Sequence, residues 1–220
     1  MKKMKLGTLL LLCVSSTAFI FPLNLQAAPI TYNDETIFQT TVGTVSVETF
    51  EDYILFEPVS VLPALGGTFD VLSNGSFPTG YDQSSGGTAR SGSVTLMNND
   101  KIGLPGLGSI VFIADSNIEF SAFGLWNTGG DDTVRLSVYD ANNILLATTV
   151  STFGESFIGI SGLLGGVRAE ISAETGNGWF SIDDLQTATI STVPIPSAVW
   201  LFGSGLLALV GFGSNRSKKS

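Results

Sequence analysis

Short stretches in the middle of the chain alternate apolar with polar residues, which is the period of a half-buried β-strand. They are rich in β-branched and aromatic residues. The clearest of them are residues 45–50, 93–97, 109–113, 118–126, 133–139 and 167–171. Clusters of glycine, asparagine and aspartate lie between them, and these residue types favour turns. The spacing predicts about eight to ten strands.

Residues 28–192 contain no apolar period of about 3.6 residues over ten or more positions, so we expect no helix there. We therefore predict an all-β fold, an antiparallel two-sheet sandwich, and within that class a jelly roll. Residues 131–151 form its clearest predicted hairpin. Residues 73–91 are rich in glycine and serine, and we interpret them as a long loop.

The C-terminal end departs from this pattern. Residues 197–213 contain no charged residue, and a tail with Arg216, Lys218 and Lys219 follows them. The run is at the short end of the roughly 17–25 residues that cross a bilayer as a helix. Because basic residues favour the cytoplasmic side, we expect a C-terminal transmembrane helix with the preceding chain outside. The alternative is a buried helix of a soluble domain, but the run has no polar face to present to water.

The N-terminal end has the layout of a secretory signal peptide. Residues 1–5 are basic, residues 6–21 are apolar, and a short segment ends in Ala27. We expect an N-terminal signal helix and cleavage after Ala27, which divides the chain into a signal peptide (1–27), a β-sandwich ectodomain (28–192) and a C-terminal segment (193–220). Cleavage removes Cys13, the single cysteine, so no disulfide stabilises the mature domain.

The ectodomain is strongly acidic. It carries all 19 acidic residues of the chain and only four basic ones, Arg90, Lys101, Arg135 and Arg168, so its formal charge is −15. A surface this negative repels phosphate backbones, and we therefore expect no nucleic-acid partner. It is compatible with divalent cations.

Acidic pairs on two strands suggest a metal site. Glu51 and Asp52 follow the first strand, and Asp183 and Asp184 lie inside the last, residues 179–185. The first and last strands of a sandwich commonly lie close together, and an acidic pair in an apolar strand is costly unless it is paired or binds a metal. We predict that these four acids bind a structural calcium ion. The alternative is that one acid of each pair faces solvent and the other caps a turn.

Aromatic residues beside polar ones suggest a glycan-binding site. Tyr81 precedes Asp82 in the predicted loop, and Trp126 precedes Asn127 at a strand end. Aromatic faces stack on sugar rings, while amides and carboxylates bind sugar hydroxyls. The alternative is that Trp126 and Trp179 fill the core at strand ends and Tyr81 covers the loop.

Catalytic chemistry is poorly represented. The chain has no histidine, which excludes an imidazole base, the usual serine triad and a histidine zinc site. A pair of carboxylates roughly 5–10 Å apart, as in glycoside hydrolases, is what remains. Nothing in the sequence singles out such a pair among the 19 acids, and we do not expect an enzyme.

The residues ahead of the apolar span carry a family resemblance. Val193, Pro194, Ile195 and Pro196 directly precede it. This arrangement strongly resembles the PEP-CTERM sorting signal in its Val-Pro-x-Pro variant, which occurs in exported proteins of Gram-negative bacteria that make exopolysaccharide. Two features depart from the family pattern: glutamate is replaced by Ile195, and the usual arginine cluster is diluted by lysine.

The resemblance implies that an exosortase, a membrane transpeptidase, recognises this motif after export by the Sec machinery and cleaves near it. The C-terminal helix would then anchor the protein in the inner membrane only temporarily, before transfer to the cell surface or extracellular matrix. Residues 50–52, 157–160 and 182–185 look like the jelly-roll ectodomains of such proteins, which are similar to carbohydrate-binding modules.

The leading interpretation is an exported, non-catalytic protein of the cell surface or matrix, a biofilm component with exopolysaccharide as its candidate ligand. One alternative is a surface enzyme, similar to a glycoside hydrolase, that uses two carboxylates. The other is a purely structural or adhesive coat protein.

Overall fold

The computed structural model describes residues 28–72, 77–82, 88–98, 108–129, 133–174 and 178–189. The predicted signal peptide and the C-terminal segment lie outside these ranges, as does the sorting motif at residues 193–196. No helix in the described part of the chain is long and apolar enough to cross a membrane.

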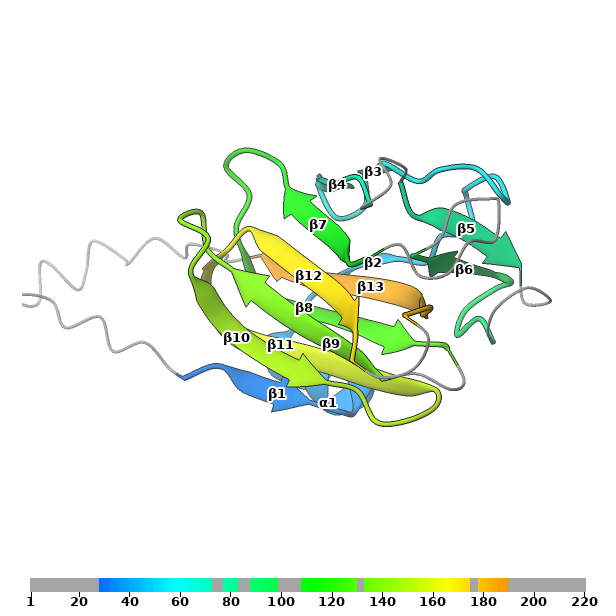
Figure 1. Ribbon diagram of the computed structural model, residues 1–220. Helices are drawn as coiled ribbons and strands as arrows, with labels where there is room; N and C mark the ends of the chain where they lie inside the picture. Colours follow the sequence, from blue (N-terminus) through cyan, green and yellow to red (C-terminus); the bar gives the residue numbers. More distant parts are fainter. Residues whose placement is uncertain are drawn as a thin grey trace, which may run out of the picture.

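Two antiparallel sheets form a sandwich (Figure 1). The strands of sheet A are β1 (Ile30–Tyr32), β2 (Ser46–Glu48), β5 (Thr79–Asp82), β6 (Val94–Met97), β8 (Phe120–Asn127), β11 (Ser156–Gly166) and β13 (Ser181–Thr189). The strands of sheet B are β3 (Val61–Leu62), β4 (Gly67–Phe69), β7 (Ile110–Ala114), β9 (Val134–Tyr139), β10 (Leu145–Val150) and β12 (Arg168–Ala173).

Most neighbouring strands come from distant parts of the sequence, whereas β3–β4, β5–β6 and β9–β10 are pairs of consecutive strands. The order in sheet A is β1-β11-β8-β13-β6-β5, with β2 paired to β13, and the order in sheet B is β10-β9-β12-β7-β4-β3. The predicted hairpin is confirmed, because β10 pairs with β9. The prediction of a long loop at residues 73–91 is wrong in part, since Thr79–Asp82 forms β5 and pairs with β6.

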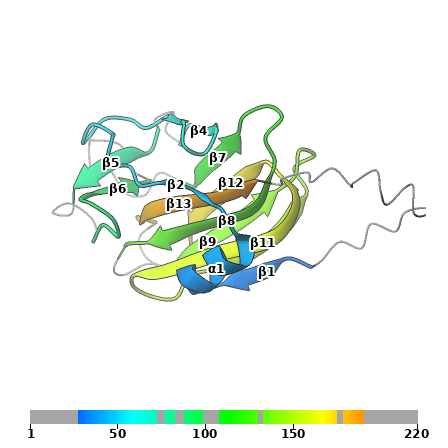
Figure 2. The ribbon, with the colours of Figure 1, turned by 180° about the vertical axis from the view of Figure 1, so that it is seen from behind.

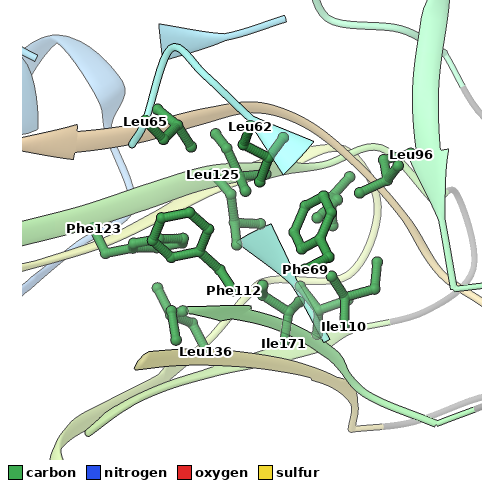
Figure 3. Close-up of a cluster of buried hydrophobic side chains, with 14 of the residues drawn as sticks. Leu62, Leu65, Phe69, Leu96, Ile110, Phe112, Phe123, Leu125, Leu136 and Ile171 are labelled. Atoms are coloured by element: carbon green, nitrogen blue, oxygen red, sulfur yellow. The ribbon is translucent and has the colours of Figure 1, made fainter. Parts of the chain in front are cut away.

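Apolar side chains from both sheets fill the space between them (Figure 3). Phe112 of β7 joins the two layers, because its ring centroid lies 5.5 Å from that of Phe123 and 6.1 Å from that of Phe120, both on β8. All three rings are buried. The chain has a single cysteine and so no internal disulfide, and the sandwich depends on this core for its stability.

The expectation of no helix in residues 28–192 is wrong, because α1 (Glu35–Val42) forms there. Asp34 caps it by accepting the N–H of Ile37 at 2.9 Å, and Glu35 complements the dipole in its first turn. With eight residues, of which only Phe38 is buried, α1 is too short to show a helical period.

The helix α1 covers the outer face of sheet A (Figure 2). Gly124 and Gly159 face each other on β8 and β11, and a Cβ on either would lie 2.8 Å from a ring atom of Phe157 or Phe38. The glycine pair therefore leaves the space that the Phe38 and Phe157 rings occupy, and these rings lie 5.3 Å apart. This second apolar cluster fixes the helix on the sheet.

Candidate functional site

Asp183 and Asp184 lie in β13 and bind the backbone and side chain of a neighbouring segment. Asp183 is fully buried, and its Oδ2 accepts the N–H of Arg90 at 2.7 Å and that of Ser91 at 3.1 Å. Its Oδ1 accepts the N–H of Asp184 at 2.7 Å. Asp184 in turn accepts the Ser91 hydroxyl at 2.6 Å. The Asp183 carboxyl group thus receives three N–H donors in the interior, which satisfy its buried oxygens.

Glu51 holds the same segment from the other side. Its Oε1 accepts the N–H groups of Ser93 at 2.9 Å and Val94 at 2.7 Å. The carboxyl group lies against Gly92, where an added Cβ would be 2.1 Å from the Glu51 Cδ, and Gly92 has a φ of +53°. Glycine is therefore required there both for space and for backbone conformation.

The structure brings three of the four predicted calcium ligands to this segment and leaves the fourth apart. Glu51, Asp183 and Asp184 contact residues 90–94, whereas Asp52 is exposed beside Glu48. Among the described residues, no group of three acids, histidines or cysteines is arranged to hold a metal ion. Calcium binding stays a prediction. The backbone N–H bonds of Asp183 and Glu51 agree with the capping part of the alternative, and the exposed Asp52 agrees with its solvent-facing part, whereas Asp184 is buried.

The buried acids have raised pKa values. Burial raises the pKa of Asp183 to about 7; the N–H donors oppose this shift, and the charge of Asp184 adds to it. Burial also raises the pKa of Asp184 above its ordinary value, against the Ser91 hydroxyl bond. The Asp183 carboxyl is therefore partly protonated near neutral pH.

Because the pKa of Asp183 is raised, we expect the free energy of unfolding to depend on pH. The folded protein keeps this proton up to about pH 7, while the unfolded chain loses it near the ordinary value of 3.8. Because the folded state binds more protons between these values, the free energy of unfolding falls as pH rises through this window, by at most about 1.4 kcal/mol per pH unit. Urea unfolding at several pH values measures the slope. Asp183→Asn should flatten it, and an unchanged slope in that variant would contradict the assignment.

Arg90 covers the face of Trp126. Its guanidinium carbon lies 4.3 Å from the Trp126 ring centroid, and its Nη2 lies 3.8 Å from Oε2 of Glu35 on α1. The Phe157 ring packs against the same indole, with centroids 5.9 Å apart. A sugar ring would have to displace Arg90 to stack on the face that the guanidinium covers.

The structure does not assemble the predicted glycan residues into one site. Tyr81 is buried in β5 against Phe56, and β6 and β13 separate this strand from Trp126 on β8. Asn127 is fully buried, and its amide nitrogen donates to Oγ of Ser151 at 3.2 Å. The side chain of Asp82 lies outside the described residues. Tyr81 and Asn127 are structural because the strands that carry them turn these side chains inward.

A cavity of about 460 Å³ opens between β2 and β3, where an edge of sheet A faces an edge of sheet B. Its lining residues are Val47, Glu48, Thr49, Asp52, Tyr53, Val61, Pro63 and Ala64. Burial raises the pKa of the Glu48 carboxyl, the N–H groups of Phe50 and Thr49 and the Tyr53 hydroxyl lower it, and the charge of Asp52 raises it. Burial and the Glu48 charge raise the pKa of Tyr53 to about 12, and Asp52 adds to this shift.

A second cavity, of about 380 Å³, shares Pro63 and Ala64 with the first. Its polar lining is Ser46, Asn117, Glu119, Thr187 and Thr189. Sequence reasoning missed both cavities. The available signal was Glu48 beside Asp52 at a strand end, but nothing in the sequence indicates that the β3–β4 connection closes over them.

Comparisons with known proteins add little. No family model matches the chain, and no curated protein matches it. Among solved structures, the K2 cleaved adhesin domain of Lys-gingipain is similar, with a TM-score of 0.46 and 12% sequence identity over 66% of this chain and 99% of that chain. At this level of similarity we base no functional argument on the match.

Proposed function

We propose that this protein is an exported, non-catalytic β-sandwich that an exosortase-type system sorts to the cell surface or extracellular matrix, where it binds exopolysaccharide. The observation that carries the proposal is the position of residues 193–196 directly ahead of the apolar span at 197–213 and its basic tail. A plain membrane anchor needs the span and the basic residues but not the proline motif.

The boundaries of the sandwich support the proposed processing. The first strand begins at Ile30, after the expected cut behind Ala27, and the last described strand ends at Thr189, ahead of Val193. Removal of both terminal segments would therefore cut through no described strand. The interleaved order of β6 to β13 in the two sheets also supports a jelly-roll ectodomain.

The burial and hydrogen bonding of Asp183 support a non-catalytic role. Asp183, whose pKa is raised to about 7, is fully buried and bound by backbone N–H groups, so a polysaccharide cannot reach it without unfolding the segment around Arg90. A second candidate function rests on Glu48 and Asp52, because a carboxyl group with a raised pKa beside a second carboxylate is the pair that glycoside hydrolysis uses.

Incubating the protein with the exopolysaccharide of the bacterium that makes it distinguishes binding from hydrolysis and from a structural role. A binding protein is retained and releases no new reducing ends. Release of new reducing ends would support the hydrolase, and neither retention nor cleavage would indicate a purely structural coat protein.

The sorting step is tested by changing both prolines of the motif. We expect Pro194→Ala with Pro196→Ala to leave the protein uncleaved in the inner membrane, with at least about a tenfold loss at the surface, because a transpeptidase recognises its motif by direct contacts. Cell fractionation and immunoblotting measure the distribution, with Thr192→Ala as the neighbouring control. If the double variant reaches the surface as the control does, the motif has no sorting role.

A further inference from the structure

Glu48 has a buried carboxyl group, and one of its oxygens accepts only a long hydrogen bond. The side chain is 8% exposed, and its Oε1 accepts the N–H of Phe50 at 3.2 Å. Its Oε2 lies 3.4 Å from the Tyr53 hydroxyl, but this hydroxyl has a single proton and lies only 2.7 Å from the carbonyl oxygen of Val61. The hydroxyl proton is therefore shared between a short contact and a long one, and the bond to Oε2 is the weaker of the two. A carboxylate oxygen accepts two bonds, so Oε2 keeps acceptor capacity on a residue that lines the cavity.

No basic side chain of the described residues lines this cavity. None of its lining residues is lysine or arginine. The three arginines of the described ranges lie beside other acids: Arg90 beside Glu35, Arg135 beside Glu174 and Arg168 beside Glu170. The exposed Asp52 adds a second negative charge next to Glu48. A buried carboxylate without a basic partner is costly, and a ligand that donates N–H bonds and carries positive charge would lower this cost.

The walls of the cavity favour an ammonium group on a carbon framework over a bare metal ion. The two carboxylates supply at most about four of the six to eight oxygens that a calcium ion binds. Val47 and Val61, 37% and 53% exposed, provide aliphatic surface beside the half-buried Tyr53 ring. This combination suits a ring that has an apolar C–H face and one charged substituent.

The second cavity lies next to the first and offers room for a second unit of a longer ligand. Hydroxyl-bearing side chains line it, and the hydroxyl oxygen of Thr187, a residue 3% exposed, has no hydrogen-bond partner among the described residues. Sugar hydroxyls both donate and accept hydrogen bonds, so a second ring in this cavity would meet matching groups.

We propose that the two cavities bind adjacent units of a polysaccharide that contains free amino sugars, with Glu48 receiving the ammonium group of one unit. This inference rests on the proposed polysaccharide-binding role and names the class of polymer.

Titration calorimetry with the full chain in mild detergent tests the inference. The probes are a glucosamine tetrasaccharide and its fully N-acetylated counterpart at about pH 6, which differ in charge but share the sugar framework. We expect the glucosamine tetrasaccharide to bind at least about tenfold more tightly, because acetylation removes the charge that Glu48 and Asp52 attract. Equal affinity for the two sugars, or no binding of either, would overturn the proposal.

Variants connect the binding to the cavity. Glu48→Gln should weaken binding of the glucosamine tetrasaccharide by at least about tenfold, whereas Glu155→Gln, which removes the same charge from an exposed loop, should leave it unchanged. Asp52→Asn, at an exposed position, serves if Glu48→Gln does not fold, and a loss of about threefold or more is expected. If both cavity variants bind as Glu155→Gln does, the site lies elsewhere.

Other outcomes distinguish a failure of this inference from a failure of the proposed function. If tetralysine binds as tightly as the glucosamine tetrasaccharide and depends equally on Glu48, the cavity takes lysine side chains and the sugar assignment is wrong. If the protein is retained on the producer's exopolysaccharide but does not distinguish the two tetrasaccharides, this inference fails while the proposed function stands. A protein that does not reach the surface contradicts the proposed function whatever the titration gives.

Discussion

Replacing Asp183 with alanine is expected to lower the free energy of unfolding by about 3 kcal/mol or more at a pH of about 7.5. The substitution removes the acceptor for the N–H groups of Arg90, Ser91 and Asp184. Asp183 is fully buried, so water cannot replace the carboxylate without opening the structure. Each unpaired buried N–H costs roughly 1–3 kcal/mol, partly offset because the charged carboxylate itself no longer has to be buried.

Urea unfolding of the full chain in mild detergent measures this loss, and Asp140→Ala is its control. Asp140 also accepts two N–H groups, from Asn142 and Ile144, but in an exposed turn where water can bind them instead. We expect a loss of about 1 kcal/mol or less for that variant. Equal losses in the two variants would mean that burial of Asp183 contributes nothing.

Gly67→Ala, in strand β4 of sheet B, is expected to lower the free energy of unfolding by about 3 kcal/mol. A Cβ at this position would lie 2.5 Å from two ring atoms of Phe112 and 2.6 Å from the backbone oxygen of Ile113. The ring is held between the two sheets and the oxygen belongs to the paired strand β7, so neither can move freely.

Thermal unfolding compares this variant with Gly129→Ala. Gly129 is also buried, but its Cβ would meet its nearest atom at 3.4 Å, an ordinary contact distance. The control should therefore melt close to the wild-type protein. A Gly67→Ala protein as stable as the control would show that β4 and β7 are not packed as described.

The strands of the sandwich could be predicted because their apolar pattern is local. Residues 133–139 and 109–113 alternate with the period of a strand, and the structure has β9 and β7 there. The turn at Asp140 uses residues that favour turns, so the hairpin from β9 to β10 was predictable as well.

Elements stabilised by distant contacts could not be predicted in the same way. The helix α1 is one of them, since Phe38 is buried only because Gly124 and Gly159 leave space on a sheet far away in the sequence. Thr79–Asp82 forms a strand because β6 supplies an edge to pair with, which overrides its content of turn-forming residues.

The cavity beside Glu48 also depends on contacts between distant parts of the sequence and could not be predicted. In β2, simple alternation would bury Val47 and expose Glu48, but Glu48 is buried and Val47 is 37% exposed. The reason is tertiary, because the cavity between β2 and β3 forms only when the edges of the two sheets meet. The acidic pairs drew attention to Asp183 and Glu51, yet their donors at residues 90–94 lie far from both in the sequence.

Mass spectrometry of the protein recovered from the cell surface and the culture medium tests the central claim most directly. Sorting and processing predict a chain that begins at Ala28 and has lost the apolar span at residues 197–213. Recovery of a surface chain that still contains Leu201 to Gly213 would contradict processing at the motif. A full-length chain that begins at Met1 and remains inside the cell would contradict export itself.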